Sequence, residues 1–136
     1  MRCVLVVEDE AEIRFLLREL LVDAGYAVAT AANGEEALDQ MHEHRPDAVL
    51  LDLMMPVMDG WRFLEVCRTH ASFANVPIGV LSAAADLERV ERELGAWTVI
   101  GKPFSIDNLL GTLEQLFVHP TTAAELVADG GVRVSV

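Results

Sequence analysis

The feature that most constrains this chain is a series of short apolar runs without regular polar–apolar alternation. Five runs are predicted to be β-strands: Cys3–Val7, Tyr26–Ala31, Ala48–Leu51, Pro77–Leu81 and Thr98–Ile100. Three of these runs are apolar at nearly every position, which is typical of strands covered on both faces of a parallel sheet.

The segments between the first runs carry apolar residues at helical spacing. The first predicted helix stops at Gly25, and its apolar stripe consists of Ile13, Leu16, Leu17, Leu20, Leu21 and Ala24. Asn33 and Glu36 form a capping-box pattern that opens a second helix. This helix is predicted to end at about His44, because Pro46 bars its continuation.

Three further helices follow. The third is predicted from about Gly60 to His70, with a buried face made of Phe63, Leu64 and Cys67. The fourth spans Asp86 to Leu94. Ser105 is expected to cap the last helix, whose predicted core positions are Ile106, Leu109, Leu110, Leu113, Leu116 and Phe117.

This fivefold alternation of strand and helix predicts an α/β fold. Right-handed crossovers then place the strands in one parallel sheet, with helices on both faces. A length of 136 residues predicts one domain. The domain is expected to span residues 1–118, and residues 119–136, where the pattern lapses, are predicted to be a flexible tail.

Composition excludes several classes of protein. An apolar content of 52% argues against disorder. The net charge of −12 disfavours direct nucleic-acid binding, which needs a basic surface, and favours cations or basic proteins as partners. No apolar run approaches the ~20 residues of a membrane span. The first strand follows Met1 too closely for a secretory leader, so a cytoplasmic location is expected.

Polar side chains follow four of the five predicted strands. They are Glu8, Asp9 and Glu10 after the first strand, Asp52 after the third, Ser82 (followed by Ala83) after the fourth, and Lys102 (followed by Pro103) after the fifth. The carboxyl ends of parallel strands meet at one edge of the sheet, where such folds place their sites. Clustered carboxylates repel one another, and hard oxygen ligands of this kind suit Mg²⁺.

Each of these residues also has a purely structural interpretation. Asp9 has Glu12 at the capping-box distance and is a candidate helix N-cap. Ser82 alone is typical of a cap or turn, and Lys102 alone is typical of a solvated surface lysine. Asp52, however, follows an apolar run and would carry a desolvation cost without a partner. The joint arrangement favours a functional site.

With these residues at its strand ends, the chain resembles the receiver domain of the two-component response-regulator family, over approximately Met1–Val118. The matching segments are Glu8-Asp9, DLMMPVMDG from Asp52 to Gly60, Ser82-Ala83, and Lys102-Pro103-Phe104. Each match is weak by itself, but their order and positions at the strand ends make the set specific. The resemblance implies a flavodoxin-like (βα)5 fold with strand order 2-1-3-4-5.

The resemblance also implies a phosphorylation switch that uses a divalent ion. Asp9 and Asp52 would ligate Mg²⁺, or Mn²⁺ in its place, together with the backbone carbonyl of Met54, while Glu8 would act through water. Asp52 would accept the phosphoryl group from a phosphohistidine on a sensor histidine kinase or phosphotransfer protein. The general physics agrees, because phosphoryl transfer depends mainly on positioning and charge neutralisation.

Around the phosphoryl group, Ser82 would donate a hydrogen bond and Lys102 would form an ion pair. The Lys102–Pro103 peptide bond is expected to be cis, as in the family. Movement of the loops that begin at Ala83 and Pro103 would change the surface of the fourth helix, fifth strand and fifth helix, which is the expected output face towards an unknown downstream protein.

Three positions depart from the family pattern. Val99 stands where an aromatic residue is usual, so the output is expected to depend on the Ser82 loop and the fourth helix instead. Glu8 replaces the commoner Asp. Trp97 either folds over neighbouring apolar side chains or anchors a partner or a second copy. The oligomeric expectation is a monomer or a phosphorylation-dependent homodimer.

Other functions fit this sequence less well. An aspartyl-phosphate phosphohydrolase needs a general acid/base Asp two residues after the nucleophile, where this chain has Met54, so an enzyme acting on external phosphates is not expected. A flavodoxin-like FMN site needs a phosphate-binding loop, where this chain has three acids. A pseudo-receiver that serves only as an interaction module is disfavoured, because the acidic, serine and lysine positions are all filled. A receiver excised from a hybrid kinase or multidomain regulator remains an alternative.

Overall fold

The computed structural model describes residues 1–52, 60–83, 99–102 and 104–118, without the side chains of Trp61, Ala83 and Val99. Its elements, in chain order, are β1 (Cys3–Val7), α1 (Ala11–Asp23), β2 (Ala27–Ala31), α2 (Gly34–His44), β3 (Ala48–Asp52), α3 (Gly60–Thr69), β4 (Ile78–Ala83), β5 (Val99–Lys102) and α5 (Ile106–Val118). β1 has its predicted bounds, and the other four strands differ from the predicted ranges by one or two residues at an end.

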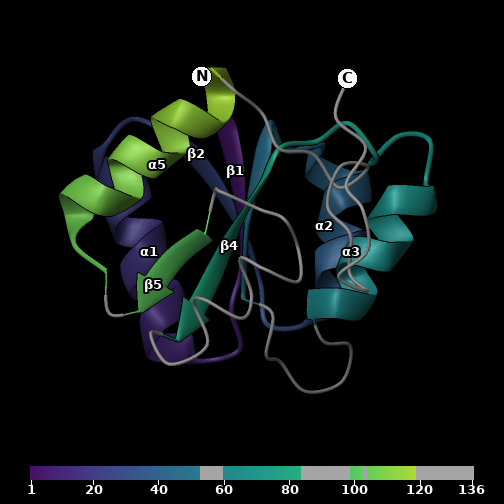
Figure 1. The fold of residues 1–136 in the computed structure, drawn as a ribbon, viewed down its shortest axis with the longest axis horizontal. Helices are drawn as coiled ribbons and strands as arrows, with labels where there is room; N and C mark the ends of the chain where they lie inside the picture. Colours follow the sequence, from purple (N-terminus) through teal and green to yellow (C-terminus); the bar gives the residue numbers. More distant parts are fainter. Residues whose placement is uncertain (53–59, 84–98, 103, 119–136) are drawn as a thin grey trace.

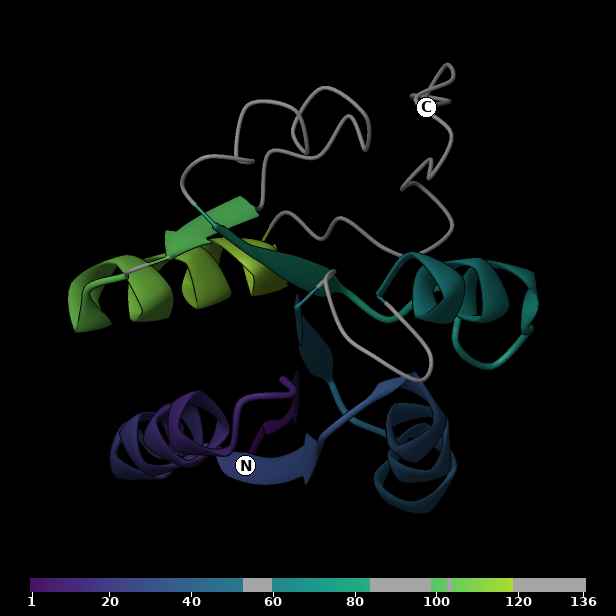
Figure 2. The same cartoon turned by 90° about the horizontal axis from the view of Figure 1, so that it is seen from below.

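The strands form one parallel sheet in the order β2-β1-β3-β4-β5. Helices α1 and α5 cover one face of this sheet, and α2 and α3 cover the other (Figures 1 and 2). The flavodoxin-like class and the strand order are therefore confirmed. The carboxyl ends of β1, β3, β4 and β5 meet along one edge, where the acidic residues lie.

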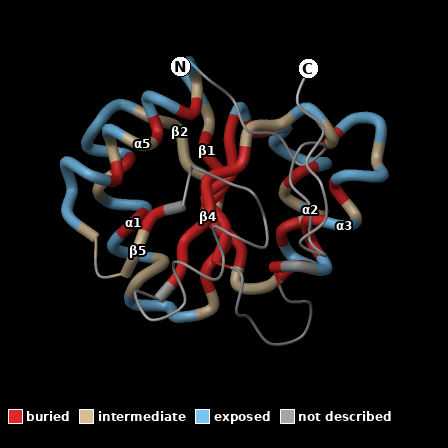
Figure 3. The backbone as a smooth tube through the Cα atoms, in the orientation of Figure 1, coloured by how far each residue is buried: buried red, intermediate tan, exposed pale blue. Residues whose placement is uncertain are grey.

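Two apolar layers hold the sheet between the helices, and the strands form the buried centre of the molecule (Figure 3). Successive residues of a strand point to opposite faces. On β1, Val4 and Val6 pack in the layer that contains α1 and α5, whereas Leu5 and Val7 pack in the layer that contains α2 and α3. Continuous apolar runs are thus explained by burial on both faces.

Side-chain hydrogen bonds cap the N-terminal ends of α2 and α5. The Asn33 side chain accepts a hydrogen bond from the Glu36 amide at 2.9 Å, and the Glu36 carboxylate accepts one from the Ala32 amide, so the predicted cap of α2 is confirmed. The predicted cap of α5 is also confirmed, because the Ser105 hydroxyl accepts a hydrogen bond from the Asn108 amide at 3.0 Å.

Three residues of the predicted apolar stripes are exposed instead of buried: Leu16, Ile106 and Ala24, which is the C-cap of α1. Leu16 is half exposed, because it lies about 100° around α1 from the buried Leu17. Ile106 is also half exposed, because it is the first residue of α5 and precedes the first buried position, Leu109. Among the described helices, none has the length and apolarity needed to cross a membrane.

Several predictions fall outside the described residues. They are the helix over Asp86–Leu94, the flexible tail over 119–136, and the assignments for Met54, Trp97 and Pro103. The backbone of Val99 lies in β5, but nothing is described of its side chain.

Candidate metal and phosphoacceptor site

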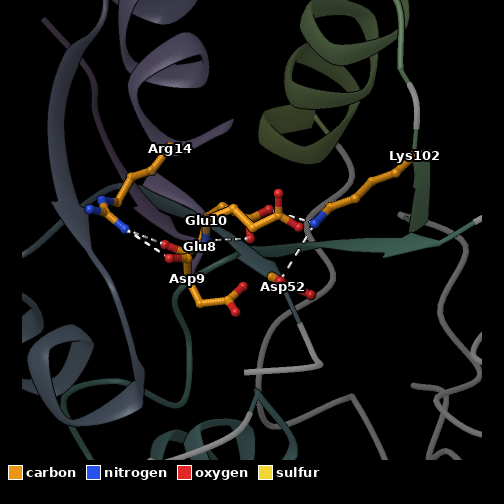
Figure 4. Close-up of polar contacts among 6 residues, drawn as sticks. All are labelled: Glu8, Asp9, Glu10, Arg14, Asp52 and Lys102. Atoms are coloured by element: carbon orange, nitrogen blue, oxygen red, sulfur yellow. Dashed lines mark hydrogen bonds and ion pairs between the residues drawn. The ribbon is translucent and has the colours of Figure 1, made fainter. Parts of the chain in front are cut away.

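The register of β1 and β3 places two acids side by side at the sheet edge. Val7 pairs with Leu51, so the next residues, Glu8 and Asp52, leave the two neighbouring strands at the same level. Asp9 follows in the β1–α1 loop. One carboxylate oxygen from each acid lies within 4.8 Å of the other two, which is a spacing that a single metal ion can span. Figure 4 shows the three carboxylates facing a common space with Lys102 beside it.

The three acids differ in burial. Glu8 is 0% exposed and Asp52 is 6% exposed, whereas Asp9 is partly open to solvent. Buried carboxylates carry a desolvation cost unless they are paired with cations. The site therefore combines an open side, at Asp9, with two buried anions that require a positive partner. An arrangement of this kind fits a hard divalent ion that keeps part of its water shell.

Lys102 supplies one positive partner. Its Nζ atom lies 2.5 Å from Glu8 Oε1 and 3.5 Å from Asp52 Oδ2. β4 lies between β5 and β3, so the long lysine side chain reaches past the end of β4 to the acids. Burial opposes the charge of the ammonium, but the hydrogen bond to Glu8 and the negative field of the two carboxylates outweigh it and raise the pKa of Lys102.

At Glu8, the effect of burial is larger than that of the hydrogen bond from Lys102, so the charged form is disfavoured. Burial, together with the neighbouring carboxyl of Asp52, raises the pKa of Glu8 to about 7, although the hydrogen bond from Lys102 works to lower it. The carboxylate is held at both oxygens, because the Glu10 amide donates to Glu8 Oε2 at 3.3 Å while Lys102 binds Oε1.

Arg14 supplies a second positive charge at this loop. Its Nη1 atom donates to the carbonyl oxygen of Glu8 at 2.8 Å and lies 3.4 Å from the carbonyl oxygen of Asp9. Arg14 is not among the predicted site residues. The available signal was a cation in the first helical turns after three consecutive acids.

The remaining predicted residues lie at the ends of β4 and β5. Ser82 is 6% exposed on β4 and pairs in register with Gly101, the residue before Lys102. The interpretation of Asp9 as a helix cap is wrong, because the N-cap position of α1 is Glu10, whose side chain makes no cap hydrogen bond. The structure thus brings Glu8, Asp9, Asp52 and Lys102 together.

Comparison with known families agrees with this geometry. The model of the family described as "Response regulator receiver domain" matches residues 4–114. The chain belongs to this family. Receiver domains generally bind Mg²⁺ at an acidic site and interact with histidine kinases or phosphotransfer proteins, and the cluster of Glu8, Asp9 and Asp52 is this chain's candidate for that site.

The receiver's curated relatives include both long and short proteins. It is 42% identical over 130 residues to the response regulator MprA of Mycobacterium tuberculosis, which covers 92% of this chain and 55% of that protein. It is 42% identical over 123 residues to the probable transcriptional regulator ycf27 of Guillardia theta, covering 89% and 47%. The chain therefore spans about half the length of these two relatives.

A shorter relative matches over most of its length. Sporulation initiation phosphotransferase F of Bacillus subtilis is 40% identical over 108 residues, which is 78% of this chain and 86% of the relative. Among solved structures, the chemotaxis response regulator CheY4 of Vibrio cholerae has 36% identity and a TM-score of 0.77, covering 85% of this chain and 98% of its own. The receiver domain of NtrX from Brucella abortus has 30% identity and a TM-score of 0.74.

Proposed function

We propose that this receiver domain is a phosphorylation switch in which Asp52 accepts a phosphoryl group in a Mg²⁺-dependent reaction. The observation that carries the proposal is the cluster of three carboxylates within 4.8 Å, with Lys102 Nζ 3.5 Å from Asp52. This combination gathers a nucleophile, a set of metal ligands and a cation at one point, and these are the parts that phosphoryl transfer requires.

The chemistry assigns a separate task to each residue. An Asp52 oxygen forms the new O–P bond while the P–N bond of a donor phosphohistidine breaks, and the imidazole nitrogen keeps the bonding pair. A carboxylate needs no general base for this attack at neutral pH. Lys102, which contacts Asp52, would pair with a phosphoryl oxygen. Ser82, at the end of β4, would donate a hydrogen bond to another oxygen.

The acidic residues would hold the divalent ion. Asp9 and Asp52 provide oxygen ligands of the kind Mg²⁺ prefers, Glu8 would act through water, and the Met54 carbonyl is a further ligand proposed from the family pattern. When bound, the ion supplies a positive charge that offsets the charge on the transferred group. Lys102 and the ion would then share the neutralisation of the acids.

The partners and the response follow from the same proposal. The donor would be a sensor histidine kinase or a phosphotransfer protein, and a downstream protein would read the face built from the predicted Asp86–Leu94 helix, β5 and α5. The phosphoryl group adds about −1.5 to −2 charge beside Asp52. Lys102 would leave Glu8 to meet this charge, which alters β5 and the loops at its end. The protein would be a monomer or would dimerise on phosphorylation.

The proposed switch does not turn over an external phosphate. Met54 stands two residues after the nucleophile and has no proton to transfer to a leaving group or water, so slow self-dephosphorylation is the expected fate of the adduct. The same activity is expected if the chain is one part of a hybrid kinase or a multidomain regulator.

Incubation with acetyl phosphate and Mg²⁺, followed by intact mass measurement, tests this proposal. We expect one alkali-labile phosphoryl adduct, which is prevented by prior chelation of the metal and absent in Asp52→Asn. Asp39→Asn is the matched control, because Asp39 is an exposed acid on α2, and it should be phosphorylated like the wild type. A stable adduct that persists in Asp52→Asn would refute the assignment.

A further inference from the structure

Arg14, on α1, donates hydrogen bonds to the backbone of the loop between β1 and α1. The half-buried Arg14 side chain turns back from α1 towards the loop, and its guanidinium donates to the backbone carbonyl of Glu8 at 2.8 Å and approaches that of Asp9 at 3.4 Å (Figure 4). Charge-assisted hydrogen bonds of this kind are stronger than those between neutral groups. The loop that carries two of the three acids is therefore tied to α1.

The peptide unit between Asp9 and Glu10 is held at both ends. Its carbonyl oxygen, from Asp9, faces the Arg14 guanidinium, and its N–H group, from Glu10, donates to Glu8 Oε2 at 3.3 Å. Because a peptide unit is planar, contacts at both ends fix its orientation. Lys102 binds the other oxygen of Glu8, so an alternating series of positive and negative groups runs from β5 to α1.

Asp9 depends on this peptide for its direction. One oxygen of its carboxylate lies within 4.8 Å of the candidate ligand atoms of Glu8 and Asp52. At the start of α1, the carbonyl of the N-cap residue Glu10 accepts a hydrogen bond from the Arg14 amide at 2.9 Å, but the Glu10 side chain makes no cap hydrogen bond. Among the described contacts, the Arg14 guanidinium is the side-chain group of α1 that reaches the carbonyls of Glu8 and Asp9.

We infer that Arg14 is a positioning residue that orients the Asp9–Glu10 peptide and so aims the Asp9 carboxylate at the divalent ion shared with Glu8 and Asp52. The inference rests on the proposed function of this site. Arg14 acts through the backbone and does not touch the ion. Groups that orient metal ligands from outside commonly change metal affinity by about 10–100-fold when they are removed.

The direction in which metal affinity changes in Arg14→Ala distinguishes the possible roles of Arg14. A positive guanidinium beside the acids repels a divalent cation, so loss of its charge alone would strengthen metal binding. Loss of the loop orientation would instead weaken metal binding. A role only in folding would lower thermal stability and leave the affinity of the folded protein for the metal unchanged. The three roles therefore predict three different results for Arg14→Ala.

The experiment is a titration with Mn²⁺, in which electron paramagnetic resonance measures the free ion. We expect Arg14→Ala to raise the dissociation constant by about tenfold. Arg14→Lys should restore part of the affinity, because an ammonium keeps the charge and one donor but lacks the planar fork that reaches two carbonyls. The matched control is Arg18→Ala, which removes an exposed arginine one turn further along α1 that pairs with Glu19 at 2.6 Å. Its affinity should equal that of the wild type or be slightly higher.

Unchanged or tighter Mn²⁺ binding in Arg14→Ala, with normal binding by the wild type, would overturn the role of Arg14 and leave the proposed function intact. An absence of Mn²⁺ binding by the wild type would overturn both. If Arg14→Ala does not fold, as judged by circular dichroism, Arg14→Lys carries the test. Affinity equal to that of the wild type in Arg14→Lys would then refute the need for two carbonyl contacts.

Discussion

Replacement of Glu8 by Gln should remove a pH dependence of stability that this buried carboxyl imposes. Burial and the nearby Asp52 raise the pKa of Glu8 from 4.5 to about 7. The folded protein therefore binds a proton at this position more tightly than the unfolded chain does. The resulting contribution to stability is fully present below about pH 4.5 and is lost as the pH rises through about 7.

The magnitude follows from the size of the shift. At about 1.4 kcal/mol per pKa unit, a rise from 4.5 to about 7 corresponds to about 3 kcal/mol of unfolding free energy, most of which is lost between pH 5 and 8. Gln at position 8 does not titrate. The two proteins share all other titrating groups, so the difference in unfolding free energy between Glu8→Gln and the wild type reports Glu8 together with its coupled neighbours Asp52 and Lys102.

Urea denaturation in EDTA at constant ionic strength, followed by circular dichroism at several pH values, measures this difference. We expect the variant to gain about 2–3 kcal/mol relative to the wild type from pH 5 to 8. Glu43→Gln, an exposed position on α2, is the control and should show a constant difference. A constant difference for Glu8→Gln as well, or a change of opposite sign, would refute the account of this carboxyl.

Three further predictions concern the helix cap, the buried thiol and the site lysine. Asn33→Ala removes the acceptor for the Glu36 amide and should lower the unfolding free energy by about 1 kcal/mol in urea titrations, whereas no change would contradict the role of the cap. Burial raises the pKa of Cys67 to about 12. In Cys3→Ser, where Cys67 is the remaining thiol, we expect reaction with Ellman's reagent at pH 8 only after denaturation. Rapid reaction of the native variant would contradict the burial of Cys67. Lys102→Ala should still accept the phosphoryl group but lose the change in amide NMR shifts on phosphorylation, because the cation that moves from Glu8 is gone. An unaltered response would contradict the role of Lys102.

The fold was predictable because its strongest sequence signal, the continuous apolar runs, follows directly from the burial of the strands on both faces. Runs such as Val4–Val7 and Ala48–Leu51 are buried on both faces of the sheet, and a continuous apolar pattern reports this directly. The error at Leu16 shows where the signal becomes ambiguous. α1 carries apolar residues beyond its buried stripe, and spacing alone does not separate a half-exposed leucine from its buried neighbour.

The site was predictable at the level of strand ends but not at the level of contacts. The convergence of Glu8, Asp52 and Lys102 follows from parallel strands that end at one edge. The direct bond between Lys102 and Glu8 depends on side-chain length and on the position of β4 between β5 and β3. The contacts of Arg14 join a side chain to backbone carbonyls, which are present at every residue and leave no pattern in the sequence.

Chemical trapping of the acyl phosphate tests the central claim most directly. Borohydride reduces an aspartyl phosphate to homoserine, and tandem mass spectrometry of the digested protein then locates the modified residue. After treatment with acetyl phosphate and Mg²⁺, the account predicts homoserine at position 52 and at no other aspartate. Homoserine at position 9 instead, or an unmodified Asp52 in protein that carries the phosphoryl mass, would contradict it.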